Sequence, residues 1–196
     1  VYTHFSVADS DENYTKEQIE RFNKGLEVIE KYFDDIKYIH TSASNGILNF
    51  ENNKCNTARP GIIMYGYESF KGAYGKLDFK ARINFVKTIE KGDSVSYGRL
   101  FIADKTTKVA TVPLGYADGI RRSMTGAKVF VNGHTAKIIG RVCMDSFMID
   151  VTDIENVKID DEVFIWDNNK IKLEEIANEC ETINYEILST ISNRVV

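Results

Sequence analysis

The hydrophobic period of the chain changes near residue 73, and this change restricts the possible folds more than any other feature. Before it, apolar strand-like segments alternate with a helical segment, and polar residues gather where the strand-like segments end. That order is typical of a parallel βα unit. After it, Phe79, Ala81, Ile83 and Phe85 alternate with polar residues, as in an antiparallel strand with one buried face. The sequence therefore predicts an α/β part over about residues 1–72 and an all-β antiparallel domain over about residues 73–196.

The first part contains one clear helical pattern between two short strand-like segments, residues 1–5 and 38–40. Thr15 precedes Gln18 by three positions, a capping-box pattern that predicts the start of the helix. Apolar residues then recur every three or four positions and predict one buried stripe: Ile19, Phe22, Leu26, Ile29 and Phe33. A third strand is predicted to end within residues 57–65.

The second part is predicted to consist of short strands followed by two short helices. The strands are expected at residues 95–103, 108–114, 128–131, 135–138, 141–144, 147–151 and 162–166, and the helices at 173–179 and 185–191. Asn132-Gly133 is a strong hairpin signal, because both residues adopt left-handed backbone conformations readily.

Composition excludes several classes of protein. The hydrophobic share of 43% and the charged share of 28% are those of an ordinary globular chain. The net charge is -4 and no basic stripe is present, which argues against a nucleic-acid partner. Three widely spaced cysteines form no C-x-x-C pair, so no zinc site is predicted and reduced cytosolic thiols are expected. Because the chain begins at Val1 and runs at once into a strand-like segment, we expect it to be a fragment of a longer protein.

Two tyrosines stand beside glycine at the ends of strand-like runs, in Ser94-Val95-Ser96-Tyr97-Gly98 and Gly115-Tyr116-Ala117-Asp118-Gly119. A phenol at a strand end commonly makes a single structural hydrogen bond. Beside a cationic partner it can also act as an acid or base. Both interpretations of Tyr97 and Tyr116 stay open on these residues alone.

An anion site is indicated by Arg59-Pro60-Gly61-Ile62. A guanidinium on a proline-stiffened turn, followed by glycine, offers a fixed cation beside backbone N–H groups. The alternative is an arginine that pairs with a carboxylate. Ser44 lies in a serine-rich loop after residues 38–40 and could present a hydroxyl to a phosphate. His4 ends the first strand-like segment, where α/β barrels place functional groups, although a packing role is the simpler interpretation.

The segment Arg141-Val142-Cys143-Met144-Asp145 ends another strand-like run. Cys143 lies in an apolar stretch with no adjacent base, so a buried, inert thiol is expected. Met144 and Asp145 could present a backbone N–H and a carboxylate to a ligand. The arginines at positions 121, 122 and 141 are expected on solvated faces.

Taken in order, these segments resemble the alanine racemase family of pyridoxal-phosphate enzymes. The resemblance covers almost the whole chain and is carried by Thr3-His4-Phe5, His40-x-x-x-Ser44, Arg59-Pro60-Gly61-Ile62-x-Met64-Tyr65-Gly66, Val95-Ser96-Tyr97-Gly98, Gly115-Tyr116-Ala117-Asp118-Gly119, Arg141-Val142-Cys143-Met144-Asp145 and Tyr185-Glu186-Ile187. It implies the C-terminal part of a TIM-type barrel that binds the cofactor, followed by a C-terminal β domain.

The resemblance also implies where pyridoxal 5'-phosphate binds. His4 would pack against the pyridine ring and hydrogen-bond the catalytic tyrosine. Arg59 would donate a hydrogen bond to the pyridine nitrogen. Ser44 and the backbone N–H groups of Gly61 and Ile62 would hold the phosphate.

For the substrate, the resemblance implies a small amino acid in a site shared between the subunits of a head-to-tail homodimer. Tyr97 would be one of two bases that flank the α-carbon, contributed by the opposite subunit. Tyr116 would line the access channel, and the backbone of Met144 with Asp145 would lie near the substrate carboxylate. No metal is implied.

Two departures from the family pattern affect the predicted function. No lysine of this chain matches the one that binds the cofactor, which in the family lies upstream, so we expect this chain to be inactive alone. Asn193 stands where most of the family has tyrosine. A smaller amide side chain there leaves room for a hydroxylated substrate. In this respect the chain resembles the membrane-anchored serine racemase branch associated with vancomycin resistance. That branch implies a cytoplasmic domain whose parent carries an N-terminal membrane domain. A lesser departure, Ala43 in place of asparagine, affects one supporting contact.

The sequence thus favours part of a racemase that interconverts L- and D-serine, with alanine as a second substrate. One alternative is an ordinary alanine racemase in which Asn193 is neutral. Another is a non-catalytic module for dimerisation or binding, which the missing lysine favours for this chain by itself. A decarboxylase of related fold is a weaker alternative, because its glycine-rich phosphate loop and cysteine motif are absent.

Overall fold

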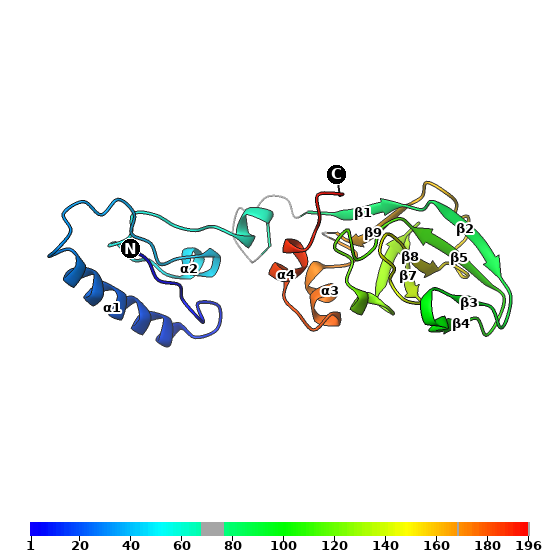
Figure 1. The fold of residues 1–196 in the computed structure, drawn as a ribbon, viewed down its shortest axis with the longest axis horizontal. Helices are drawn as coiled ribbons and strands as arrows, with labels where there is room; N and C mark the ends of the chain where they lie inside the picture. The colour runs from blue at the N-terminus through cyan, green and yellow to red at the C-terminus, as the bar shows by residue number, and fades with distance from the viewer. Residues whose placement is uncertain (68–76, 168, 196) are drawn as a thin grey trace. The chain divides into compact units, whose positions relative to one another are not determined.

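The structure is a computed structural model that describes residues 1–67, 77–167 and 169–195. The chain divides into two compact units, Val1–Lys76 and Leu77–Val196 (Figure 1). The junction expected at residues 72 and 73 lies outside the described residues.

In the first unit, the two predicted short strands meet in a single parallel bridge between Tyr2 and His40. Thr3 N–H donates to the His40 carbonyl (3.3 Å), and His40 N–H donates to the Val1 carbonyl (3.1 Å). Within the part of the chain that the structure describes, neither segment extends into a full strand. The pairing direction is nevertheless the parallel one that the βα pattern predicts.

Helix α1 (Glu12–Ile29) has its N-cap at Asp11, four residues before the predicted cap at Thr15. Asp11 caps it by accepting a hydrogen bond from Tyr14 N–H (2.9 Å), and Thr15 lies buried inside the first turn. The predicted Thr15–Gln18 capping box is therefore wrong, because aspartate is among the best N-cap residues and comes first. The helix also ends before Phe33, whose surface is 64% exposed.

Two shorter helical turns complete the first unit, α2 (Ser44–Asn49) and the 3-10 turn η1 (Ile62–Tyr65). The third strand predicted within residues 57–65 is absent, and η1 occupies its end. Among the described residues, no helix is both long and apolar enough to cross a membrane.

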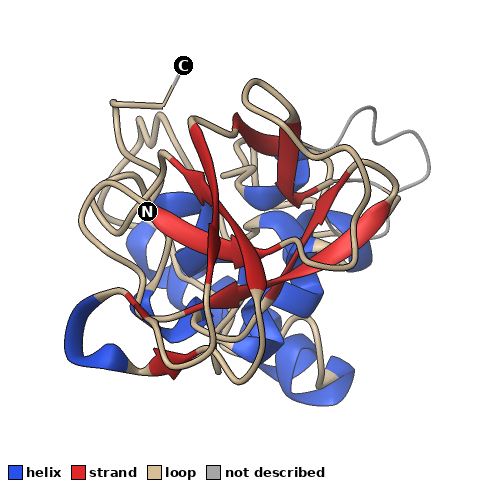
Figure 2. Ribbon diagram, turned by 90° about the vertical axis from the view of Figure 1, so that its right-hand side faces the viewer, coloured by secondary structure: helices blue, strands red, loops and turns tan. Residues whose placement is uncertain are grey.

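The second unit is built on a seven-stranded antiparallel sheet, whose strands are drawn in red in Figure 2. The order across the sheet is β1-β9-β6-β7-β8-β5-β2. The strands are β1 (Phe79–Arg82), β2 (Phe85–Ile89), β5 (Thr107–Val112), β6 (Lys128–Val131), β7 (His134–Ile139), β8 (Phe147–Asp150) and β9 (Glu162–Trp166). The prediction of an antiparallel β domain is confirmed.

Two of the predicted strands are wrong in the same region. The segment 95–103 is divided into β3 (Ser94–Val95) and β4 (Phe101–Ile102), with a 3-10 turn η2 (Tyr97–Arg99) between them. The segment 141–144 is a loop that follows Gly140 in a left-handed conformation, and Cys143 N–H closes a turn on the Ser146 carbonyl (2.9 Å). Both errors have the same cause. In each segment the side-chain pattern alone predicts a strand, but a backbone turn interrupts it.

The hairpin predicted at Asn132-Gly133 is confirmed. These residues join β6 to β7 with backbone φ values of 47° and 87°. The predicted helices are confirmed as α3 (Leu173–Glu179) and α4 (Asn184–Ser189), and a 3-10 turn η3 (Arg122–Met124) lies between β5 and β6.

The sheet has apolar cores on both faces. Ala110, Ile138 and Ile149 pair across β5, β7 and β8 and are fully buried in the larger core. Val109 and Ile139, the next residues along two of these strands, point to the opposite face. There they pack in a smaller core with Ile89, Val95, Ala103, Phe101 and Met148. This smaller core anchors the β3–β4 hairpin, whose turn carries Tyr97.

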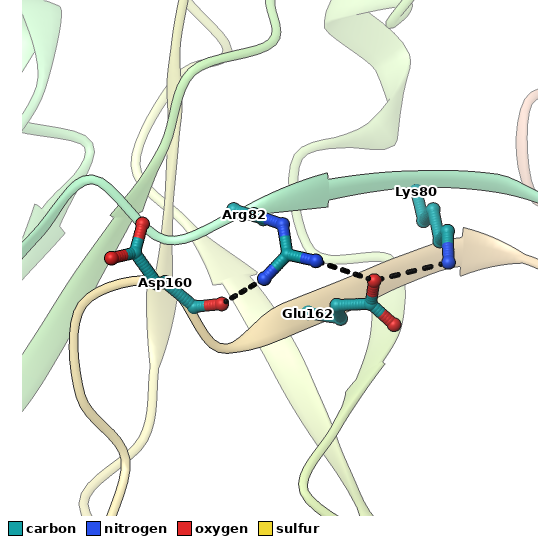
Figure 3. A network of polar contacts seen from close by, with 4 residues as sticks. All are labelled: Lys80, Arg82, Asp160 and Glu162. Atoms are coloured by element: carbon teal, nitrogen blue, oxygen red, sulfur yellow. Dashed lines mark hydrogen bonds and ion pairs between the residues drawn. The ribbon is translucent and has the colours of Figure 1, made fainter.

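The outer edge of the sheet is joined by charged side chains. Glu162 of β9 accepts from Lys80 (3.0 Å) and Arg82 (3.1 Å) of β1, and Arg82 also donates to the Asp160 carbonyl (3.0 Å) (Figure 3). Exposed ion pairs of this kind stabilise a fold by at most about 1 kcal/mol. These contacts join the side chains of β1 and β9 at the edge of the sheet.

Candidate active site

The guanidinium of Arg59 lies at the centre of a polar cluster in the first unit. Its Nη2 donates to the carbonyls of Thr3 (2.9 Å) and Thr41 (3.1 Å) and lies 3.1 Å from Nδ1 of His4. Its Nη1 contacts Nδ1 of His40. Contacts from two separate segments therefore hold this cation in one orientation, beside the histidine predicted to face the cofactor.

His40 belongs to the same cluster. Its ring stacks on Tyr2 at 5.1 Å, and the Arg59 guanidinium lies 5.5 Å from the centre of the Tyr2 ring. Burial, followed by the Arg59 charge, lowers the pKa of His40 below its ordinary value. The imidazole is thus kept neutral, which leaves a ring nitrogen available to accept from the guanidinium.

A hydroxyl and a backbone amide lie side by side at the second predicted binding position. Ser44, 2% exposed at the start of α2, accepts a hydrogen bond from Gly61 N–H (3.1 Å). Ile62 is buried and begins η1 directly after Gly61. Arg59 N–H donates to the Ser42 carbonyl (2.9 Å), which fixes the two loops together.

These two clusters fit a phosphorylated heteroaromatic group. The guanidinium can donate to a ring nitrogen, and an imidazole lies beside it. The Ser44 hydroxyl can begin a phosphate cradle, because its oxygen accepts from the Gly61 N–H and its own hydrogen is left to donate to a phosphate oxygen.

In the second unit, Tyr97 lies at the turn between β3 and β4 with 73% of its surface exposed. The preceding residue, Ser96, donates from its hydroxyl to the Arg141 carbonyl (2.6 Å) and lies 3.4 Å from the Cys143 sulfur. Cys143 is half-buried rather than buried as expected. The turn that carries Tyr97 is thus fixed to the loop that carries Met144 and Asp145.

The same loop also holds the turn that carries Tyr116. Tyr116 N–H donates to the Cys143 carbonyl (3.0 Å), and Ala117 N–H donates to the Met144 carbonyl (2.9 Å). A Cβ atom on Gly115 would lie 2.3 Å from the Met144 backbone, so only glycine permits this approach. Tyr116, Met144 and Asp145 are all exposed on these adjoining turns.

Asn193 is placed by its neighbours in the chain. Ser192 N–H donates to the Asp118 carbonyl (3.4 Å), and Nε of Arg194 lies 3.2 Å from Oδ1 of Asp118. Gly119 adopts a φ of 108° against the backbone of Ile191. The C-terminal segment is therefore fixed to the turn that carries Tyr116, and Asn193 is exposed beside it.

Within each unit, the residues predicted from the sequence lie in neighbouring segments. The first unit gathers His4, Ser44, Arg59, Gly61 and Ile62, and the second gathers Tyr97, Tyr116, Met144, Asp145 and Asn193. The described residues include no cluster of three or more histidine, cysteine or acidic side chains that could hold a metal ion.

Sequence reasoning missed the supporting residues of the second group. Ser96 and Asp118 lie inside the two tyrosine motifs. This position in the sequence was the one available signal that could have identified them as supporting residues. Arg121, expected on a solvated face, instead pairs with Glu186 of α4, and its side chain is 24% exposed. That pairing and a bond from Thr182 lower the pKa of Glu186, with the Thr182 hydrogen bond the larger cause.

Comparison with known proteins matches both units to one family. Residues 1–69 match "Alanine racemase, N-terminal domain" and residues 76–196 match "Alanine racemase, C-terminal domain". The chain is 43% identical over 208 residues to an alanine racemase of Clostridium tetani, a match that covers 100% of this chain and 54% of that protein. The chain thus spans about half the length of the curated relatives it matches.

Solved structures give the same result. The alanine racemase of Bacillus anthracis with bound L-Ala-P is similar at a TM-score of 0.89 and 34% identity, over 100% of this chain and 53% of that one. The alanine racemase of Clostridium difficile in complex with cycloserine has a TM-score of 0.87 and 32% identity, over 99% and 54%. The alanine racemase of Bartonella henselae with covalently bound pyridoxal phosphate has a TM-score of 0.85 and 25% identity, over 100% and 55%.

Proposed function

The chain belongs to the alanine racemase family, and from that premise we propose that it is the C-terminal part of a pyridoxal-phosphate-dependent amino-acid racemase. The observation that carries this proposal is the Arg59 cluster, in which a guanidinium held by two backbone carbonyls lies 3.1 Å from the imidazole of His4. The relative from Bartonella henselae, with its covalently bound pyridoxal phosphate, supports the choice of cofactor. The barrel prediction for the first unit agrees with this family.

When bound, pyridoxal phosphate supplies the electron sink that makes the α-hydrogen of an amino acid acidic enough to remove. Arg59 would donate to its ring nitrogen without transferring a proton, because a guanidinium is not deprotonated in proteins. Arg59 would thereby leave the ring nitrogen uncharged and the electron sink weak, an arrangement that would favour return of a proton over side reactions. Ser44, Gly61 and Ile62 would hold the phosphate.

Tyr97 is the proposed acid and base for one face of the α-carbon. Its phenol is exposed at a hairpin turn, so it can enter a site built by another subunit. We propose that it does so in a homodimer, where His4 of one subunit hydrogen-bonds Tyr97 contributed by the other. Tyr116 would line the access channel, and Met144 with Asp145 would face the substrate carboxylate.

The second base would be the lysine that holds the cofactor, in a segment that precedes Val1 in the longer protein. This chain covers 54% of its relative from Clostridium tetani, which leaves room for such a segment. Without it, we expect the chain to have no racemase activity of its own. Cofactor bound to a lysine of a longer natural chain would argue against the alternative of a non-catalytic module.

The proposed reaction is tested on the longer protein with alanine and serine as substrates. We expect absorbance from bound cofactor and racemisation of at least one of them. Tyr97→Phe should lower kcat by about 100-fold or more while cofactor content is unchanged, since it removes the proton-carrying atom alone. A Tyr97→Phe variant with the wild-type rate would overturn the assigned role.

For the substrate, we propose serine together with alanine. The names of the relatives support alanine. Asn193 supports serine, because an amide can pair with a substrate hydroxyl that a phenol in the same place would crowd. Asn193→Tyr should therefore lower the serine-to-alanine ratio of kcat/KM, whereas Asn178→Tyr on the exposed side of α3 should leave it unchanged. Strong preference of the wild type for alanine would favour the ordinary alanine racemase instead.

A further inference from the structure

Ser96, which directly precedes the proposed acid and base Tyr97, has an unusual backbone conformation. Its φ is 66° and its ψ is 179°. Side chains rarely tolerate this combination, which is essentially restricted to glycine. A serine held in such a conformation indicates that its surroundings impose it.

Contacts on both sides account for the conformation. The Ser96 hydroxyl donates to the Arg141 carbonyl (2.6 Å) and lies 3.4 Å from the Cys143 sulfur. Gly140, which directly follows β7, approaches this turn closely. A Cβ added to Gly140 would lie 2.7 Å from the Val95 carbonyl oxygen and 2.8 Å from the Ser96 Cβ. The hydroxyl bond and this close approach hold Ser96 against residues 140–143.

The fixed backbone conformation of Ser96 affects the direction of the next residue, Tyr97. Its side chain is largely exposed, so its own packing does little to fix its direction. Gly98, on its other side, has a φ of 71°, with the Arg141 guanidinium 3.2 Å from the position of an added Cβ. Tyr97 therefore stands between two residues of positive φ, of which Ser96 is bonded to the loop that follows β7 and Gly98 lies beside the Arg141 side chain of that loop.

We propose that Ser96 is a positioning residue for Tyr97: its hydroxyl, by its bond to the Arg141 carbonyl, holds the backbone in a left-handed conformation that directs the phenol toward the substrate. This inference rests on the proposed function of Tyr97 and deepens it. The loop that carries Met144 and Asp145 thereby also sets the direction of the acid and base.

The test compares Ser96→Gly and Ser96→Ala in the longer racemase. Glycine adopts the left-handed conformation freely and lacks the hydroxyl, so Ser96→Gly should keep the wild-type melting temperature within a few degrees. Its kcat should still fall about 10- to 100-fold with little change in KM, because a misdirected catalytic group costs rate rather than binding. Ser96→Ala should lower both kcat and the melting temperature, since it keeps the strain and loses the bond that holds it.

Asn132 offers a matched control. It also has a left-handed φ, of 47°, and its side chain also makes a hydrogen bond, from Nδ2 to Oδ2 of Asp161 (2.6 Å). It lies in the β6–β7 hairpin, apart from the turn that carries Tyr97. Asn132→Gly should leave kcat unchanged.

A second measurement separates a positioning role from a structural one. With α-deuterated substrate, the isotope effect on kcat should increase in Ser96→Gly in only one of the two reaction directions, the one in which Tyr97 removes the proton. A Ser96→Gly variant with kcat within twofold of the wild type, or with equal isotope effects in both directions, would overturn the inference. If Tyr97→Phe is itself fully active, the role of Tyr97 fails instead, so the two failures are distinguishable.

Discussion

The Nε atom of Arg194 lies 3.2 Å from Oδ1 of Asp118, and this pair ties the C-terminal segment to the turn that carries Tyr116. The Asp118 side chain is 4% exposed, and its other oxygen accepts from Gly115 N–H (2.8 Å). One buried carboxylate therefore closes its own turn and also holds the residue next to Asn193.

Replacing Arg194 with glutamine should destabilise the protein and weaken substrate binding. The buried Asp118 carboxylate would lose its charged partner, and because Arg194 is itself half-exposed we expect a loss of about 1–2 kcal/mol rather than the full cost of an unpaired buried charge. Asn193 would then be held less firmly, so KM should rise several-fold. Urea unfolding and steady-state kinetics measure the two effects.

Arg82→Gln provides the comparison, because Arg82 also pairs with a carboxylate but at the exposed edge of the sheet (Figure 3). Its loss should cost less than about 1 kcal/mol and leave KM unchanged. Equal costs for the two variants would show that burial of Asp118 does not strengthen its pairing.

Asp11→Ala should destabilise the first unit by about 1 kcal/mol, because it leaves a backbone N–H at the start of α1 without its acceptor. Ser10→Ala removes a neighbouring hydroxyl that, among the described residues, bonds only to the Asp9 side chain, and it should have almost no effect. Chemical unfolding with circular dichroism compares the two. If Thr15→Ala proved costly and Asp11→Ala neutral, the capping box expected from the sequence would regain support.

Some elements that depend on their own residues were predicted correctly from the sequence, although the Thr15–Gln18 cap of α1 was not. The Asn132-Gly133 hairpin is an example, because asparagine and glycine tolerate positive φ wherever they occur. The turn at Ser96 could not be predicted, because serine favours no such conformation. Its cause lies 45 residues away, where Arg141 supplies the acceptor.

The candidate site likewise contains features that the sequence predicts and features that it does not predict. The chemistry of His4, Arg59 and Tyr97 is visible in ordered motifs, and the prediction of the alanine racemase family is confirmed by the matches to both family domains. The carbonyls of Thr3 and Thr41 that hold Arg59 carry no sequence signal, since every residue has a carbonyl. Their role depends on how the chain folds around the guanidinium. The preference for serine stays a prediction.

Gly115→Ala should be among the most damaging single substitutions in the second unit. Its Cβ would lie 2.3 Å from the backbone of Met144, and backbone atoms on both sides cannot move apart without breaking the bonds of Tyr116 and Ala117. We expect a loss of about 3 kcal/mol or more, measured by chemical unfolding, together with loss of activity.

Gly25→Ala is the matched control, for which we expect the opposite effect on stability. Gly25 lies within α1, where an added Cβ would meet nothing within 4 Å, so alanine should stabilise the protein by about 0.5–1 kcal/mol. A neutral Gly115→Ala would contradict the close approach between the two turns.

His40 should make stability fall in mildly acidic solution. The pKa of His40 is lowered in the folded chain by burial and by the Arg59 charge. Above about pH 6.5 the ring is neutral in both folded and unfolded chains, so it contributes its full stability there. As the pH falls below that value, the His40 ring binds a proton in the unfolded chain but not in the folded chain. The free energy of unfolding therefore decreases until the pH passes the lowered pKa of the folded chain.

His40→Asn, which can still accept from Arg59, should therefore flatten the dependence of the melting temperature on pH between about 7 and 5. The wild-type chain, heated over the same pH range, gives the reference slope. If His40→Asn keeps that slope too, the Arg59 cluster does not hold the imidazole neutral. The same outcome would remove the argument that His40 accepts a hydrogen bond from the guanidinium, and Arg59 would then depend on the carbonyls of Thr3 and Thr41 for its orientation.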